Sequence, residues 1–237
     1  QDALDSAESD VAREALLDEL RGNVVEAVRC PHANHVMQKA VATMRPKAAQ
    51  FIVDELASAP IITIARHKYG CRTVQRLIEH LYPEQVQKLV QPLLKVALAL
   101  ASHPYGNFVV RVLLQHGTDD QRKHLLRTFE KNLRSLAADR FGCAVLGVAL
   151  GLSDEAEVER LACTMAEEPG LLAFIASCRH GAATVISVLE ALPMVARATA
   201  MNSIRPQLNG LRASASLAEA VDYLDGTLRE QMAKAGA

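Results

Sequence analysis

The sequence predicts an all-α protein built from stacked helical repeats, an α-solenoid. A ten-residue block recurs five times, helix-spaced apolar residues follow the same point of every block, and no stretch sustains the alternation typical of a strand. The blocks are CPHANHVMQK from residue 30, HKYGCRTVQR from 67, HPYGNFVVRV from 103, DRFGCAVLGV from 139 and CRHGAATVIS from 178.

Each block is centred on a small residue, and these residues are evenly spaced. The steps between them are 37, 36, 36 and 39 residues, a size typical of solenoid repeats. The third, fourth, seventh and eighth positions after each small residue are apolar, apart from two threonines, so a helix with one buried face should start near each one. The small residues are Ala33, Gly70, Gly106, Gly142 and Gly181.

The segments between the blocks also have helical signals. Pro46 and Pro83 suit the first turn of a helix, and Thr118 or Ser153 suits an N-cap. Each repeat therefore accommodates two helices, or three short ones, and stacked repeats provide a long concave surface.

The repeats define a single domain over residues 1–237, with residues 1–29 and 192–237 expected as caps. The longest step contains CTMAEEPG at 163–170, which we interpret as a small loop insertion. Because the chain does not begin with Met, we expect it to be incomplete at its N-terminus.

Composition indicates a folded, soluble protein of a reducing, intracellular compartment. Half of the residues are hydrophobic, yet no apolar run approaches the roughly 18 residues that a membrane helix needs. The five cysteines are odd in number and lack the paired spacing of a zinc or redox motif, and no phosphate loop or nucleophile elbow occurs. We expect no enzymatic activity, no cofactor and no metal.

Three positions of each block remain once the apolar face is assigned: the first, second and fifth after the small residue. The first and fifth lie on one helical face, so their side chains can converge on one object. An amide pair suits the edge of a base, and a flat ring or guanidinium suits stacking between bases. The trios with such groups are Asn34, His35 and Gln38; Cys71, Arg72 and Gln75; and Asn107, Phe108 and Arg111.

The stretches NHVMQK, YGCRTVQRLIEHL and HPYGNFVVRVLLQHG resemble the RNA-binding repeats of the Pumilio (PUF) family, and the resemblance extends over roughly residues 20 to 225. It implies a right-handed superhelix of five triple-helical repeats, corresponding to the fourth to eighth repeats of a Pumilio homology domain. It also implies that each middle helix presents its trio to one base of single-stranded RNA, uracil at Asn34/His35/Gln38 and adenine at Cys71/Arg72/Gln75.

The later repeats depart from the family's pattern. Arg111 stands where a uracil-reading repeat has Gln, so its base is left open between cytosine, guanine and a backbone contact. The last two trios have no polar edge-reading pair, so base reading should fade toward the C-terminus and strict recognition of a UGU triplet is not expected. These weakly RNA-facing residues are Cys143, Ala144, Gly147, Ala182, Ala183 and Ile186.

Positive charge is concentrated in the five blocks. They hold seven Lys or Arg residues and one acid, whereas the whole chain has a net charge of −1. This distribution suits contacts to phosphate groups. Residues expected to contact phosphates are Lys39, Lys68 and Arg76.

These observations predict a monomeric, cytoplasmic protein that binds mRNA 3′ untranslated regions and controls translation or stability, with protein co-regulators on its convex face. A nucleolar ribosome-biogenesis protein that holds RNA without a base code is one alternative. An armadillo- or HEAT-like scaffold for protein partners is the other.

Overall fold

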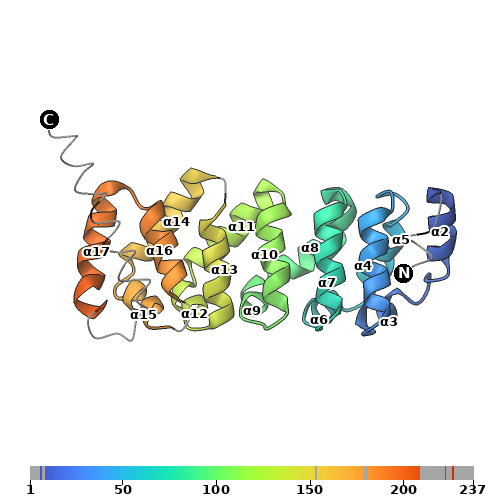
Figure 1. Cartoon of the computed structure of the whole chain (residues 1–237), viewed down its shortest axis with the longest axis horizontal. Helices are drawn as coiled ribbons and strands as arrows, with labels where there is room; N and C mark the ends of the chain where they lie inside the picture. Colours follow the sequence, from blue (N-terminus) through green and yellow to red (C-terminus); the bar gives the residue numbers. More distant parts are fainter. Residues whose placement is uncertain are drawn as a thin grey trace. The chain divides into compact units, whose positions relative to one another are not determined.

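The computed structural model describes residues 6, 9–152, 154–178, 181–208, 222 and 226. The chain divides into two compact units, residues 1–125 and 126–237. Within the described residues, all regular secondary structure is α-helical, in helices α2 to α17 (Figure 1). No described helix is long and apolar enough to cross a membrane. The predicted all-α class is confirmed, whereas the expectation for Ser153 and most of the cap expected over 209–237 fall outside the described residues.

The first unit contains an opening helix and three repeats of three helices each. In every repeat a helix of five or six residues comes first and a helix of eleven residues follows. The helices are α2 (Asp10–Asp18); α3 (Val24–Arg29), α4 (Ala33–Thr43) and α5 (Gln50–Ala57); α6 (Ile61–Ala65), α7 (Gly70–His80) and α8 (Pro83–Lys95); and α9 (Ala97–Ala101), α10 (Gly106–His116) and α11 (Asp119–Glu130), which continues past residue 125.

The second unit continues the same order of helices in two further repeats. Its middle helices, α13 and α16, again have eleven residues and pack against each other. The helices are α12 (Leu133–Ala137), α13 (Arg140–Leu150) and α14 (Glu155–Glu167), followed by α15 (Leu171–Ser177), α16 (Gly181–Ala191) and α17 (Met194–Leu208).

Three sequence-based assignments are corrected. Residues 24–29 and 194–208 are not caps, because α3 opens the first repeat and α17 closes the fifth. The stretch 163–170 is not a loop insertion, since 163–167 belongs to α14, where Leu161, Ala162 and Met165 are buried. The fifth repeat is longer because of the turn at Glu168–Gly170 and because α15 has seven residues.

The middle helices bury the face that the sequence predicts. All of the apolar-register residues are buried except the half-buried Val36. In the first unit α4, α7 and α10 lie side by side, each packed on the next (Figure 1). The second and fifth residues after the small residue are thereby left on a shared, unburied side of these helices, apart from Gln75, which is buried.

A small residue lies in the first turn of each middle helix because the first helix of the repeat passes closely. A Cβ atom on Gly70 would lie 2.8 Å from the carbonyl oxygen of Ile64 and 2.9 Å from its Cγ2. Such contacts are shorter than real Cβ atoms show. The first repeat has Ala33 in place of glycine at the start of its middle helix. Six residues earlier it has the small residue Ala27, where the other repeats have Ile or Leu.

Candidate nucleic-acid interface

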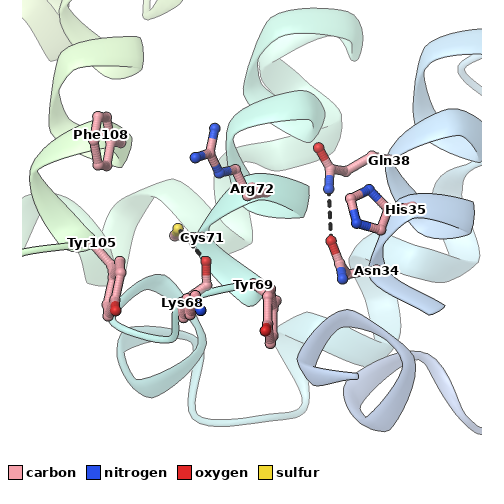
Figure 2. Close-up of a pocket in the computed structure, with 9 residues that line it drawn as sticks. All are labelled: Asn34, His35, Gln38, Lys68, Tyr69, Cys71, Arg72, Tyr105 and Phe108. Carbon is pink, nitrogen blue, oxygen red and sulfur yellow. Dashed lines mark hydrogen bonds between the residues drawn. The ribbon is translucent and has the colours of Figure 1, made fainter. Parts of the chain in front are cut away.

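Three flat or charged side chains lie in a row across α4, α7 and α10. Figure 2 shows His35, Arg72 and Phe108 on successive helices, at the second position of each trio. His35 and Arg72 are exposed and Phe108 is half-buried, so none of the three belongs to the core. The Arg72 guanidinium carbon lies 5.8 Å from the centroid of the Phe108 ring. The predicted stacking positions therefore form one continuous series in this unit.

A cavity of about 340 Å³ opens beside this series. The first two trios line it with all of their residues except Gln75. The third trio contributes only its stacking residue, Phe108. Tyr69 and Tyr105 also line it, although the sequence analysis did not single them out; a ring directly before each small residue was the available signal. The lining residues are Asn34, His35, Gln38, Lys68, Tyr69, Cys71, Arg72, Tyr105 and Phe108 (Figure 2).

In the first trio the two edge-reading amides are already paired. The Gln38 Nε2 donates a hydrogen bond of 2.9 Å to the Asn34 Oδ1 (Figure 2). The Asn34 Nδ2 donates to the carbonyl oxygens of Cys30, at 2.7 Å, and Pro31, at 2.8 Å. Both amide donors of Asn34 are thus used by the backbone, and Asn34 can offer a ligand only its acceptor oxygen.

In the second trio both the first and the fifth residues are buried. Cys71 is 1% exposed and Gln75 is 7% exposed. The Gln75 Nε2 donates to the Cys71 carbonyl oxygen at 3.0 Å, which leaves one N–H and the Oε1 of the amide for a ligand. Burial raises the pKa of the Cys71 thiol above its ordinary value, and the thiol donates to the Lys68 carbonyl oxygen at 3.6 Å (Figure 2).

In the third trio the asparagine makes the same two backbone hydrogen bonds as Asn34, but it is not paired with the fifth residue of the trio. The Asn107 Nδ2 donates to the carbonyl oxygens of His103, at 2.8 Å, and Pro104, at 3.0 Å. The Arg111 guanidinium lies over the Phe108 ring, 5.6 Å from its centroid. The expectation that the first and fifth side chains converge therefore holds for Asn34 and Gln38, whereas Arg111 is turned toward the stacking ring.

The second unit presents small or apolar groups at the corresponding positions. Ala144 and Ala183 are exposed, whereas Gly147, Ala182 and Ile186 are half-buried. Thr184 of α16 donates to the Cys143 carbonyl oxygen of α13 at 3.2 Å. A Cβ at Gly147 would lie 3.4 Å from the Thr184 Oγ1, so the two helices approach closely at this point.

The predicted phosphate-contacting residues have intramolecular contacts of their own. Arg76 forms an ion pair of 2.8 Å with Glu79, which offsets part of its charge. The Lys68 ammonium lies 5.2 Å from the Tyr69 ring, and Lys39 is half-buried on α4. None of the ion pairs found among the described residues involves Arg72 or Arg111, so the excess positive charge lies beside the stacking series.

The histidines of the repeat register cap the middle helices. Their hydrogen bonds are local, within the first turn of the helix and the residues before it. The His67 Nδ1 accepts from the backbone N–H groups of Tyr69 and Gly70 at 3.3 and 3.2 Å. The His103 Nδ1 makes the equivalent bonds, and the Asp139 Oδ2 does the same in the fourth repeat. An unprotonated Nδ1 is required for this role.

These caps predict a pH dependence of stability. Burial, and secondarily the charge of Arg29 or Arg66, lowers the pKa of His67 and His103. The unfolded chain then binds protons more readily than the folded chain. The contribution of these caps to the free energy of unfolding is therefore fully present above about pH 6.5, and it is lost as the pH falls toward the lowered pKa. We expect His67→Asn/His103→Asn, which retains an acceptor at both caps, to lose less unfolding free energy than the wild type on acidification. Urea denaturation at several pH values measures this, and parallel pH curves would contradict it.

The first three repeats match a known family. Residues 23–57, 60–94 and 97–127 each match the model of the Pumilio-family RNA binding repeat. These three stretches are Pumilio-family repeats. It is 34% identical over 85 residues to Pumilio homology domain family member 4 of Saccharomyces cerevisiae, covering 36% of this chain and 10% of that protein. It is 49% identical over 51 residues to Fem-3 mRNA-binding factor 2 of Caenorhabditis elegans, covering 21% of this chain and 8% of that protein.

Solved Pumilio-type structures share the fold over nearly the whole chain. The Puf3 RNA binding domain bound to the Cox17 RNA 3′ UTR recognition sequence site A aligns with a TM-score of 0.78 at 21% identity, over 93% of this chain and 67% of that one. PUF-8 in complex with PBE-RNA aligns with a TM-score of 0.76 at 23% identity, over 92% and 64%. The predicted α-solenoid of Pumilio-type repeats is confirmed. The chain nevertheless spans only a small fraction of the curated relatives that it matches.

Proposed function

We propose that this protein binds single-stranded RNA selectively through α4, α7 and α10. The observation that carries the proposal is the series of His35, Arg72 and Phe108, with a hydrogen-bonding side chain beside each stacking group. Flat groups at consecutive repeats provide stacking surfaces for consecutive bases, and the neighbouring side chains discriminate among base edges. The Pumilio-type repeats and the RNA-bound relatives support the same function.

The hydrogen-bonding groups support uracil at the first trio. Uracil presents one N–H donor between two carbonyl acceptors. The Asn34 Oδ1 accepts from the base N–H, while Gln38 uses its second amide hydrogen to donate to a uracil carbonyl. The existing bond between Gln38 and Asn34 can remain in place.

Adenine suits the second trio. Its edge presents one amino donor and one ring-nitrogen acceptor. Gln75 retains a free N–H and its Oε1 after bonding to the Cys71 carbonyl oxygen, and these complement the adenine edge. If the RNA runs antiparallel to the chain, the two assignments give 5′-AU-3′.

The biological role that we propose is post-transcriptional control of mRNA in the cytoplasm through 3′ untranslated regions, by a monomer with protein co-regulators on its outer helices. Support comes from the Puf3 domain bound to a 3′ UTR sequence and from the name of the Fem-3 mRNA-binding factors. The weak edge-reading groups of α13 and α16 support the second candidate, an RNA-binding protein of ribosome assembly without a base code.

A filter-binding titration with a salt series tests the proposal. We expect binding of a short AU-containing RNA, with log affinity falling linearly with log salt at a slope of about 0.7 per neutralised phosphate. Arg72→Ala should lose RNA binding if the surface formed by α4, α7 and α10 binds RNA. Arg134→Ala, which removes an exposed arginine far from the stacking series in sequence, is the control and should keep its affinity. Absence of RNA binding at low salt would favour a protein scaffold.

Arg111→Gln should create a preference for uracil at the base 5′ to the adenine. Arginine lacks an acceptor and lies over Phe108, whereas a glutamine can complete the donor and acceptor pattern of a uracil together with Asn107. We expect about 1 kcal/mol of discrimination, at the low end for a bidentate contact because the site is half exposed. RNAs that differ only at that base measure it.

Three outcomes are distinguishable for Arg111→Gln. A uracil preference supports base reading by α10. A uniform loss of affinity with a salt slope reduced by about 0.7 identifies Arg111 as a phosphate contact. Unchanged affinity and unchanged base preference would contradict the placement of Arg111 beside RNA.

A further inference from the structure

Two thiols from successive repeats of the second unit meet at one backbone carbonyl. The Cys143 Sγ, in the first turn of α13, donates to the Ala137 oxygen at 3.2 Å. The Cys178 Sγ, directly after α15, lies 3.9 Å from the same oxygen and 3.4 Å from the Phe174 oxygen. Because both sulfur atoms contact one acceptor, they occupy a single small site between α13 and α15.

The two thiols differ in accessibility. Cys143 is 1% exposed, whereas Cys178 is half-buried. Burial first, and then the neighbouring Cys178 and Asp139, raise the pKa of Cys143 to about 11. A thiolate is the reactive form of cysteine, so the raised pKa and the burial of Cys143 both disfavour its reaction, and the more exposed Cys178 meets an external oxidant first.

We propose that Cys143 and Cys178 form a redox-sensitive pair that a peroxide converts into an intramolecular disulfide. The peroxide transfers one oxygen to the Cys178 sulfur, giving a sulfenic acid and one molecule of water or alcohol. The Cys143 sulfur then attacks the Cys178 sulfur, the S–O bond breaks, and the hydroxyl leaves as water with the Cys143 proton. Two thiols are oxidised, one peroxide is reduced, and a dithiol reductant restores the pair.

The link would join the first turn of α13 to the end of α15. Cys143 occupies the first position of the fourth trio, so oxidation removes the only polar side-chain group among the described base-facing residues of α13 and α16. The inference rests on the positions of the two thiols and does not depend on RNA binding.

The trypsin sites of the chain make the link directly measurable. Cleavage after Arg140, Arg160 and Arg179 places Cys143 in peptide 141–160, while Cys163 and Cys178 share peptide 161–179. The experiment therefore uses the full chain with Cys163→Ser. The reduced protein is treated with increasing hydrogen peroxide, quenched with N-ethylmaleimide in denaturant, digested without reductant and analysed by mass spectrometry.

We expect peptides 141–160 and 161–179 to appear joined, in a protein that stays monomeric, and to separate on reduction with dithiothreitol. The joined species should be absent when Cys143→Ser or Cys178→Ser is added, since serine keeps a donor for the Ala137 oxygen without the sulfur. The proposal is overturned if Cys143 is fully labelled with maleimide while Cys178 proceeds to sulfinic acid. It is also overturned if the joined peptides arise only in cross-linked dimers.

Discussion

Phe108→Ala is expected to weaken binding of AU-containing RNA by about 2 kcal/mol, or roughly thirtyfold. Two guanidinium groups lie near the ring centroid, that of Arg72 at 5.8 Å and that of Arg111 at 5.6 Å. Its removal eliminates a stacking surface and also leaves both arginines without the group that orders them. A filter-binding or anisotropy titration measures the loss.

Two controls make the Phe108 result specific. Phe108→His retains a flat ring, like His35 in the first repeat, and should recover most of the affinity. Tyr82→Ala removes an aromatic ring that is 62% exposed outside the stacking series, and it should leave affinity unchanged. Equal losses in Phe108→Ala and Tyr82→Ala would exclude the stacking role of Phe108.

Gly142→Ala is expected to destabilise the protein by about 3 kcal/mol, the upper range for overpacking. A Cβ at this position would lie 2.9 Å from the Leu136 carbonyl carbon and Cα and still closer to its oxygen. These are backbone atoms, so the contact cannot be relieved by a change of rotamer. Urea denaturation followed by circular dichroism gives the change in unfolding free energy.

Gly147→Ala is the matched control, because it lies on the same helix, α13. Its Cβ would meet only the Thr184 Oγ1, at an ordinary 3.4 Å. Alanine is favoured over glycine inside a helix by about 0.5–1 kcal/mol, so Gly147→Ala should be neutral or stabilising. Similar stabilities for the two variants would mean that α12 and α13 do not approach at Gly142 as described.

Most of the middle helices could be predicted from sequence because two signals coincide in them. A small residue precedes an apolar face of helical period, and α4, α7, α10 and α16 begin at the predicted residue. α13 begins at Arg140, two residues early, directly after its N-cap residue Asp139. The first helices of the repeats, such as Ile61–Ala65, are too short for periodicity to reveal.

The candidate site could be predicted less completely. Residue spacing places Asn34 and Gln38 on one face, and the structure brings their amides together. Spacing does not reveal that backbone carbonyls occupy both donors of Asn34, nor that Arg111 turns toward Phe108. Those features depend on the loop before each helix and on side-chain torsion angles, which a sequence pattern does not specify.

The base selectivity of the unmodified protein tests the central claim most directly. The measurement compares its affinity for a short RNA containing 5′-AU-3′ with its affinity for poly(C) of the same length at one salt concentration. With adenine on Cys71, Arg72 and Gln75 and uracil on Asn34, His35 and Gln38, we predict tighter binding of the AU-containing RNA. Equal affinity for both RNAs would contradict base reading by these helices and leave only the phosphate contacts.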